Sequence, residues 1–482
     1  MKVLHVAAEI FPLVKTGGLA DVTGAILPWL NQRGIDARIV LPGLPAILEG
    51  VRQQKKIAEL GPGFGAAQIA IRQGRLPVSG VQVYIVDAPW LYNRPGNPYI
   101  GPDGNGWSDN PRRFALLGFV AAHLAFGEFD PFWTPQILHA HDWHGALSLA
   151  YLAAHPAHKV KTAFTIHNLA YQGEFALADR HELGLSASVM GERGLVFHGQ
   201  GNFMKAGLSY ADQITTVSPR YANEICTPEF GCGLDGVLSE RRRQLTGILN
   251  GVDYSVWDPS TDRLIDKLYS IRNLDGKAVC KATLQKELAL KQPAGKPMFA
   301  IVSRLTDQKG MDLVLAAVPE LARLGAQLVV LGTGDKAFED KFRAAAYAYP
   351  GQIAVNINYD EAMAHRIIAA ADLILVPSRF EPCGLTQMYG LRYGTLPLVR
   401  RVGGLADTVT DTNHDTLQAD SATGFSFGAA TVAALNEAIS RAVQAFEDQT
   451  LWRGLMQRAM ARDYSWEQSS KRYLSLYRDL IG

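Results

Sequence analysis

Cysteine is scarce in this sequence, with four residues in 482, and no two of them form a CxxC pair. That spacing supplies neither a disulfide framework nor the ligands of a structural zinc site, so we expect a reducing compartment, the cytoplasm. An excess of charge is absent as well, because 47 Lys and Arg stand against 46 Asp and Glu. A balanced chain gives no electrostatic reason to expect nucleic acid or an anionic membrane as a partner.

Long apolar runs are also missing. The longest, near residues 116–126, contains His123 and is too short to cross a bilayer, and the N-terminus lacks the pattern of a signal peptide. We therefore expect no membrane segment. What is abundant is glycine, with 46 residues, and hydrophobic residues, at 48%. This composition is typical of a loop-rich α/β protein, and a chain of this length exceeds the size of one hydrophobic core.

Short aliphatic runs alternate with helical patterns, and this alternation occurs twice. The first series begins at residues 3–8 and the second at residues 299–302, after a polar stretch with few β-branched runs. We predict an α/β protein of two Rossmann-like lobes that face each other across a deep cleft, the preferred place for a ligand. The predicted parts are an N-terminal lobe (1–250), an interdomain connection (251–297), a C-terminal lobe (298–462) and a final helix (463–482).

The loop at residues 11–18 connects a predicted strand to a predicted helix. It ends in two adjacent glycines, Gly17 and Gly18, which let a ligand approach the backbone closely, and Lys15 can reach a phosphate as a point charge. The ordinary alternative is a glycine turn with a solvated lysine. The loop lacks the G-x-G-x-x-G fingerprint, which disfavours a nicotinamide dehydrogenase.

Histidines and an aspartate end the strand near residue 139. His139 and His141 share one face of that strand, so a metal hydrolase is an alternative, although one of the two histidines could simply pack beneath the loop. Asp142 lies at the carboxyl end of the strand, where open α/β sheets bind ligands. His167 and Asn168 end the next strand in the same way.

Two loops of the second lobe carry charged residues. Arg304 and Lys309 belong to a loop that runs into a helix N-terminus, where they can stabilise negative charge without a metal ion. Glu381 lies in the loop at residues 377–387, in which the backbone N–H groups of residues 384–386 open a helix and form a candidate anion site. The alternative for both loops is a set of solvated charges.

The two sets of residues suit two parts of one substrate. Cations and helix N-termini suit a diphosphate, and carboxylates, imidazole and amide suit the hydroxyls of a sugar. A sugar-nucleotide transferase needs both. No Asp-x-Asp occurs in the sequence, so Arg and Lys rather than a metal would neutralise the diphosphate. A catalytically silent glucan-binding protein is disfavoured, because Lys15, Arg304 and Lys309 are all present.

Six motifs occur in order along the chain: KTGGLAD (15–21), HAHDWH (139–144), TIHNLAYQG (165–173), NGVD (250–253), SRLTDQKG (303–310) and PSRFEPCGLTQ (377–387). With them the chain resembles the bacterial glycogen synthase and starch synthase family over nearly its whole length. The resemblance implies a glycosyltransferase B-type fold, in which the final helix returns to the N-terminal lobe. It also implies transfer of glucose from ADP-glucose to the non-reducing end of an α-1,4-glucan such as glycogen, with retention of configuration and without a metal or other cofactor.

The resemblance also implies roles for individual residues. The diphosphate would meet the cations and the N–H groups of residues 384–386, and the adenine would lie against Tyr359. The glucose would meet Glu381 and the backbone at Cys383, with His167 and Asn168 on its far side, and Asp142 would face the acceptor. The residues assigned to catalysis are Glu381, Arg304, Lys309, His167 and Asp142. Those assigned to substrate binding are Lys15, Gly17, Gly18, Asn168, Asn250, Tyr359, Cys383, Gly384, Leu385 and Thr386.

Two positions depart from the patterns of related enzymes. Many retaining relatives carry a second Glu eight residues after the first, and this chain has Tyr389 there, as the glycogen and starch synthase branch does. Asn358 stands where the family usually has a glycine before Tyr359. A retaining glycosyltransferase with another donor or acceptor is the nearest alternative function.

Overall fold

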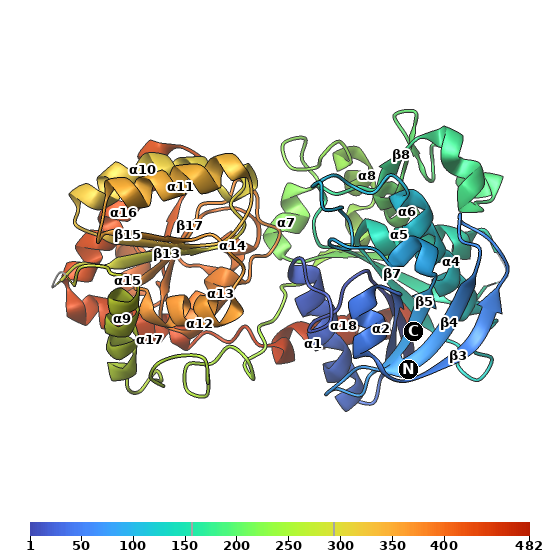
Figure 1. The fold of residues 1–482 in the computed structure, drawn as a ribbon, viewed down its shortest axis with the longest axis horizontal. Coiled ribbons are helices and arrows are strands. Elements are labelled where there is room, and N and C mark those ends of the chain that lie inside the picture. The colour runs from blue at the N-terminus through green and yellow to red at the C-terminus, as the bar shows by residue number, and fades with distance from the viewer. Residues whose placement is uncertain (156–157, 293–294) are drawn as a thin grey trace. The chain divides into compact units, whose positions relative to one another are not determined.

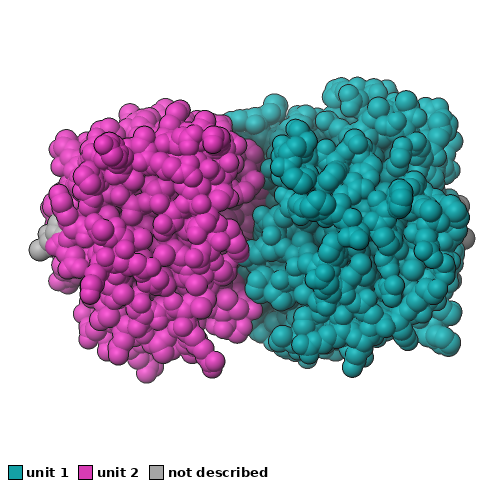
Figure 2. Space-filling view, viewed as in Figure 1, with its two compact units in different colours: residues 1–251, 466–482 teal, residues 252–465 magenta. Residues whose placement is uncertain are grey.

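The computed structural model describes residues 1–155, 158–292 and 295–482, and the chain divides into two compact units (Figure 1, Figure 2). Unit 1 comprises residues 1–251 together with residues 466–482, and unit 2 comprises residues 252–465. Figure 2 shows unit 1 in teal and unit 2 in magenta. Among the helices of the described residues, none is both long and apolar enough to cross a membrane.

Unit 1 is built on a nine-stranded sheet in the order β12-β11-β7-β6-β1-β2-β5-β4-β3. The strands from β12 to β5 pair in parallel, and β4 and β3 extend the sheet in antiparallel fashion. The central parallel strands are buried almost throughout, which explains why their sequences are continuous apolar runs. The bounds are β1 (Lys2–Val6), β2 (Asp36–Pro42), β3 (Arg52–Leu60), β4 (Ile69–Arg75), β5 (Gln82–Asp87), β6 (Ile137–His141), β7 (Lys161–Ile166), β11 (Gln213–Thr216) and β12 (Leu245–Gly247).

Helices pack closely around this sheet and on one another. A Cβ added at Gly118 of α4 would lie 2.8 Å from the backbone N of Ser148 in α5, so the small residue is what allows these two helices to meet. A small sheet, β8 (Glu174–Phe175), β10 (Gln200–Asn202) and β9 (Val196–Phe197), lies outside the main one. The helices of unit 1 are α1 (Gly18–Gln32), α2 (Pro45–Gly50), α3 (Pro89–Tyr92), α4 (Asn110–Phe126), α5 (Asp142–Ala153), η1 (Leu177–Leu183), η2 (Ala187–Val189), α6 (Phe203–Tyr210), α7 (Pro219–Glu224), α8 (Asp235–Glu240), η3 (Arg242–Gln244) and α18 (Trp466–Ile481).

Unit 2 has a six-stranded, wholly parallel sheet in the order β15-β14-β13-β16-β17-β18. Figure 1 shows α10 and α11 on one face of this sheet and α12 and α13 on the other. The strands are β13 (Met298–Val302), β14 (Gln327–Leu331), β15 (Ile353–Asn356), β16 (Leu373–Val376), β17 (Leu396–Arg400) and β18 (Phe425–Phe427). The helices are α9 (Asp275–Glu287), η4 (Asp307–Lys309), α10 (Met311–Arg323), α11 (Lys336–Ala348), α12 (Glu361–Ala370), α13 (Thr386–Arg392), α14 (Gly403–Thr408), α15 (His414–Gln418), α16 (Val432–Glu447) and α17 (Gln449–Met460).

The segment expected to be an interdomain connection, residues 251–297, is instead part of unit 2 from residue 252 onward. Its helix α9 packs against α12. The buried ammonium of Lys277 donates to the carbonyl of Ala369 (2.9 Å) and to Thr395 Oγ1 (2.6 Å). The prediction of a connection was wrong because it rested on polar composition. α9 buries only one face, and part of that buried face is itself polar.

The last helix, α18, belongs to unit 1 although unit 2 precedes it in the chain. It packs against α1, where Trp29 Nε1 donates to Glu467 Oε2 (3.0 Å). Its apolar stripe buries Trp466, Tyr473 and Tyr477, whereas Ile481 is 38% exposed. The α18 side chains therefore complete the hydrophobic core of unit 1.

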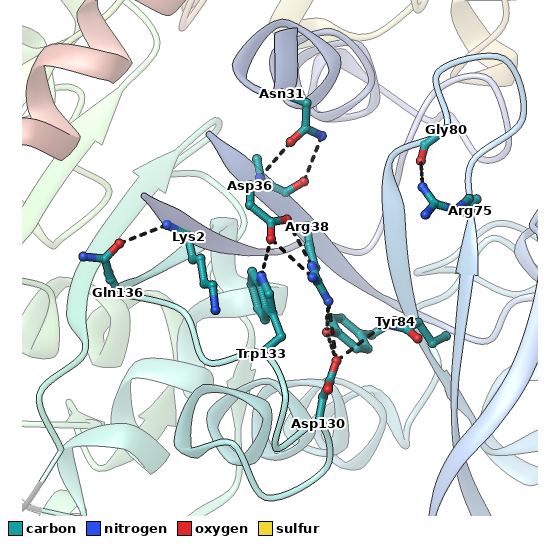
Figure 3. A network of polar contacts seen from close by, with 12 residues as sticks. Lys2, Asn31, Asp36, Arg38, Arg75, Gly80, Tyr84, Asp130, Trp133 and Gln136 are labelled. Carbon is teal, nitrogen blue, oxygen red and sulfur yellow. Dashed lines mark hydrogen bonds and ion pairs between the residues drawn. The ribbon is translucent and has the colours of Figure 1, made fainter. Parts of the chain in front are cut away.

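The amino ends of the central strands of unit 1 are joined by a polar network (Figure 3). Arg38 Nη1 donates to Tyr84 Oη (2.8 Å), which donates in turn to Asp130 Oδ2 (2.7 Å). Asp36, at the start of β2, accepts from Arg38 Nε (3.1 Å) and from Trp133 Nε1 (2.6 Å). The network stabilises the amino-end edge of the sheet. Ligands bind in such folds at the opposite edge, at the carboxyl ends of the strands.

Candidate active site

The strand order of unit 1 reverses between β1 and β6. From β1 the chain proceeds outward to β2 and β5, and it later returns to build β6, β7 and β11 on the other side of β1. Loops that leave the carboxyl ends of two such strands diverge and form a crevice. The loops after β1, β6 and β7 carry the predicted residues Lys15, Asp142 and His167, so the topology gathers them at one edge of the sheet.

The loop after β1 is organised by a buried carboxylate, Glu9. Its oxygens accept from the backbone N and the Oγ1 of Thr16, both at 2.5 Å, and from the hydroxyl of Tyr99. Lys15 Nζ lies 2.9 Å from Asp21 Oδ1 of α1. Sequence reasoning did not select Glu9 or Tyr99. The available signal was a lone acidic residue that directly follows an otherwise apolar strand.

Gly17 and Gly18 stand where α1 begins. Gly17 has an extended backbone (φ −162°) and precedes the first residue of the helix, Gly18. Among the described residues, a Cβ added at Gly17 would meet no heavy atom within 4 Å, so packing does not require a glycine at this position. The free space beside the backbone is what a ligand close to the helix N-terminus needs.

Asp142 ties the loop after β7 to the end of β6. Its Oδ1 accepts from the backbone N–H groups of His167 (2.7 Å) and Asn168 (3.3 Å). The residue has a left-handed backbone (φ +51°), which is uncommon for a residue with a side chain and occurs at functional sites. Burial raises the pKa of Asp142 to about 7, and the charge of Glu9 acts in the same direction. A carboxyl group that titrates near neutral pH is thus held at the carboxyl edge of the sheet.

The histidines of β6 point into the interior of unit 1. Both His139 and His141 are fully buried, together with His5 of β1. The three rings are close enough for their nitrogens to surround a metal ion. However, the nitrogens are already engaged: His141 Nε2 meets His5 Nδ1 (3.0 Å), and His139 meets the hydroxyls of Tyr477 and Thr165 (both 2.6 Å). The cluster therefore fits a packed hydrogen-bond network better than the open site that a metal hydrolase requires.

The strand order of unit 2 also reverses once, between β13 and β16. The loop after β13 carries Lys309 and the loop after β16 carries Glu381, and their charged groups meet at 2.5 Å (Nζ to Oε2). Ser378 Oγ donates to the same carboxylate oxygen (2.9 Å). Glu381 is buried, with 6% of its surface exposed, whereas Arg304 is exposed and donates to Gln308 Oε1 (3.3 Å).

The backbone around Glu381 rests on a second pair of glycines. Gly404 N donates to the carbonyl of Glu381 (3.1 Å), and a Cβ on Gly403 would lie 1.9 Å from that same oxygen. Gly384 has a positive φ (+72°), which places the next residues at the start of α13. Gln387 Nε2 donates to the carbonyls of Cys383 (3.0 Å) and Gly384 (2.9 Å) and fixes this turn.

Other predicted binding residues lie apart from these contacts. Tyr359, between β15 and α12, is 73% exposed and donates its hydroxyl to Glu361 Oε2 (2.6 Å). Asn250 is buried, and its Oδ1 has no hydrogen-bond partner among the described residues. An unsatisfied buried oxygen is unusual and suits a group that meets a ligand.

Tyr389, at the position of the second Glu of other retaining enzymes, belongs to an aromatic stack. Its ring lies 3.9 Å from that of Trp257, and His365 lies 3.6 Å from the opposite face of the indole. Asp262 Oδ2 meets His365 Nδ1 at 2.7 Å. In this chain position 389 therefore contributes to the packing of unit 2 through its ring.

Comparisons with known proteins agree with this architecture. A family model described as the starch synthase catalytic domain matches residues 2–240, and one described as glycosyl transferases group 1 matches residues 285–452. The chain is 52% identical to the glycogen synthase of Serratia proteamaculans and 49% identical to that of Paramagnetospirillum magneticum. The first match covers 100% of both chains, and the second covers 100% of this chain and 98% of the relative.

Solved structures lead to the same group. The catalytic domain of starch synthase IV from Arabidopsis thaliana, bound to ADP and acarbose, matches with a TM-score of 0.89 and 30% identity over 99% of each chain. Fold and matches together define a glycosyltransferase with the B-type fold, which confirms the predicted fold class. The chain belongs to the glycogen synthase family.

Proposed function

We propose that this protein transfers glucose from ADP-glucose to the non-reducing end of an α-1,4-glucan, in glycogen biosynthesis, with retention of configuration. The observation that carries the proposal is the contact between Lys309 and Glu381. This contact lies at the switch point of unit 2, the place between β13 and β16 where the strand order reverses. This contact supports the assignment of a cation to the diphosphate and of a neighbouring carboxylate to the sugar hydroxyls. The reaction needs no metal or other cofactor in this proposal, and the cysteine pattern supports a cytoplasmic location.

The donor diphosphate is held by side-chain cations and backbone N–H groups. Arg304 is exposed and its guanidinium is free to turn toward a phosphate, and Lys309 can share its three N–H donors between Glu381 and a phosphate oxygen. The N–H groups of residues 384–386, which lead into α13, attract the distal phosphate. Lys15, beside the open backbone of Gly17, contacts the same diphosphate, and the exposed ring of Tyr359 lies against the adenine.

The sugar is held by the polar residues. Glu381 and the backbone at Cys383 bind glucose hydroxyls near the reacting carbon, and His167 with Asn168 binds the far side of the ring. Asp142 faces the reacting centre and the acceptor. Support for this assignment comes from unit 1, where the carboxylate of Asp142 holds the backbone of His167 and Asn168 in place.

The chemical step in this proposal is a front-side attack. The acceptor 4-hydroxyl forms a bond to C1 of glucose while the bond from C1 to the diphosphate oxygen breaks on the same face. The hydroxyl proton passes to the departing diphosphate, whose charge Arg304 and Lys309 stabilise. The competing mechanism has a covalent glucosyl intermediate, and trapping of such an adduct would favour it.

A panel of donors and acceptors tests the proposal. ADP-glucose and UDP-glucose are offered with glycogen and with maltooligosaccharides, and the anomeric configuration of the product is followed by NMR. We expect efficient transfer from ADP-glucose to both acceptors and formation of an α-linkage. Preferential use of UDP-glucose would instead assign the protein to the alternative function, a retaining glycosyltransferase with another donor.

A further inference from the structure

A continuous chain of hydrogen-bonded rings crosses unit 1 from α18 to the candidate sugar-binding residue His167. It starts at the hydroxyl of Tyr477, which contacts two histidines, and passes through β1 and β6. The successive contacts are Tyr477 Oη to His5 Nε2 (3.4 Å), His5 Nδ1 to His141 Nε2 (3.0 Å) and His141 Nδ1 to His167 Nε2 (3.0 Å). A branch runs from Tyr477 Oη to His139 Nδ1 and from His139 Nε2 to Thr165 Oγ1, both at 2.6 Å.

All four imidazoles are neutral. Burial lowers the pKa of His5 and of His167 to about 3, and it lowers the pKa values of His139 and His141 well below the usual value. A neutral imidazole carries one N–H, so it donates on one side and accepts on the other. In a chain of such rings, the direction of donation at one end fixes the tautomer of every ring up to the other end.

The contact distances at Tyr477 set that direction. Its single proton goes to His139 Nδ1, because 2.6 Å is typical of an O–H donor and the contact with His5 is much longer. His5 then donates from Nε2 to the phenol oxygen, and its Nδ1 accepts from Nε2–H of His141. His141 Nδ1 in turn accepts from Nε2–H of His167. The remaining nitrogen of His167, Nδ1, carries no proton.

We propose that Tyr477 is a positioning residue for His167: through His5 and His141 it holds His167 as the Nε2–H tautomer, so that Nδ1 accepts a hydrogen bond from a substrate hydroxyl. This inference rests on the proposed function, in which His167 binds the transferred glucose. Its direct consequence, the tautomer of His167, does not depend on which sugar nucleotide is used. The last helix of the chain thereby influences the site without touching the substrate.

Long-range 1H–15N correlation spectra of protein labelled with 15N-histidine report the tautomer of each ring. The chain has 12 histidines, and loss of one signal in His167→Gln assigns that residue. We expect an Nε2–H pattern for His167 in the unmodified protein and a mixture of tautomers in Tyr477→Phe. With ADP-glucose and glycogen, Tyr477→Phe should lower kcat by about three- to ten-fold, the effect of losing one buried hydrogen bond, with little change in KM.

The matched control is Tyr473→Phe, on the same helix. The ring of Tyr473 lies 5.9 Å from that of His139, but its hydroxyl is not a link of the chain described above. This variant should keep both the tautomer and kcat. An Nδ1–H pattern for His167 in the unmodified protein, or an unchanged tautomer in Tyr477→Phe, would refute the proposal.

A second pair of variants tests the chain without altering α18. In His5→Asn the amide oxygen can take the place of Nδ1 and accept from His141, so the Nε2–H tautomer of His167 should persist. In His5→Leu no acceptor remains, and the tautomer should become mixed. Equal spectra for the two variants would contradict the inference, as would one tightly bound zinc per chain at His5, His139 and His141. Absence of transfer from ADP-glucose with an intact tautomer pattern would instead count against the proposed function alone.

Discussion

In unit 1 the strands next to the switch point, β1 and β6, carry buried, neutral histidines. In unit 2 the loops at the switch point carry an ion pair, Lys309 and Glu381. Burial lowers the pKa values of His139 and His141, and the neighbouring histidines act in the same direction. Lys309 and Glu381 are also largely buried, yet each has its counter-ion at 2.5 Å. One topology thus carries two kinds of buried group: the histidines of unit 1 orient donors and acceptors, and the ion pair of unit 2 provides charge.

The pentapeptide Gly-Gly-Leu-Ala-Asp, which occurs at residues 17–21 and 403–407, shows the same division. The first copy follows β1 and leads into α1, and the second follows β17 and begins α14. Gly17 leaves open space beside the backbone, whereas Gly403, with φ +43°, lies directly against the carbonyl of Glu381. In the proposed function the first pair of glycines gives access to a ligand, whereas the second supports the loop that carries Glu381.

The largest effect should come from breaking the ion pair. Glu381→Gln keeps the shape of the side chain and removes its charge, so we expect kcat for transfer from ADP-glucose to fall by about 100- to 1,000-fold, the range for loss of one preorganised electrostatic contact. Initial rates with glycogen measure the change. Glu320→Gln, which removes a surface partner of Arg323, should leave the rate unaltered. Full activity of Glu381→Gln would end the assignment of Glu381 to the sugar.

Next in size is the contrast between the two glycine pairs. Gly403→Ala forces a Cβ against the carbonyl of Glu381 in a left-handed conformation, so it should cost about 3 kcal/mol of stability. Gly17→Ala has no such contact and an extended backbone, so its stability should change by less than about 0.5 kcal/mol.

The readout for this pair is urea unfolding, followed by the KM for ADP-glucose. Gly17→Ala should raise that KM if a phosphate approaches its backbone. Equal stability losses in the two variants would show that both glycine pairs serve packing, and the proposed difference in role would be wrong.

A third test uses the pKa of Asp142. The folded pKa, about 7, lies above the unfolded value near 4, so the folded state binds the extra proton and its stability falls as pH rises between these values. Asp142→Asn removes this penalty and should stabilise the protein by on the order of 2 kcal/mol at pH 8. The gain should vanish near pH 4. Thermal unfolding across this pH range measures it, and an equal effect at both pH values would contradict the raised pKa.

The smallest expected effect concerns a charged residue of unit 2, His365. Burial opposes the charged form of His365, but the hydrogen bond that Nδ1 donates to Asp262 Oδ2 (2.7 Å) and the nearby carboxylate of Glu361 outweigh it and raise the pKa. Because the pKa of His365 is higher in the folded protein than the unfolded value near 6.5, protonated His365 stabilises the folded state fully at pH values below 6.5. This stabilisation is lost as the pH rises through the folded pKa. His365→Gln should therefore cost about 1.5 kcal/mol at pH 5.5, as for a charge-assisted hydrogen bond, and less at pH 9.

The matched control for that variant is His181→Gln, at an exposed position. Its stability relative to the unmodified protein should stay the same at both pH values. A cost of His365→Gln that is independent of pH would mean that the stack on Trp257, and not the charge, is what the histidine supplies.

Local pattern was sufficient to predict much of the fold. The strand, loop and helix around Glu381 and around Lys309 follow from aliphatic runs and from glycine, and α10 buries Leu313 and Val314. The sequence predicted that Lys309 and Glu381 belong to one site, but it did not predict that they contact each other. The two side chains meet because β13 and β16 are neighbours in the sheet. This adjacency is a result of the strand order, which the sequence of a single loop does not reveal.

Residues that act over long sequence separations were not predicted. Tyr477 and His139 are 338 positions apart, and Glu9 and Tyr99 are 90 apart, so no local spacing links them. The sequence predicts a connection at residues 251–297 because this stretch is polar, but the polarity of the exposed face of α9 says little about its buried face. Single-residue chemistry was visible in the sequence, and the partners of each residue were not.

The return of α18 to unit 1 has a consequence for biosynthesis. Ribosomes release residues 1–251 first, and all of unit 2 must be synthesised before α18 emerges. Until then His139 has no Tyr477 beside it, and the surface of α1 that packs against α18 is uncovered. Unit 2, being contiguous, can fold as soon as it is made, so the unit that begins first is the one that is completed last.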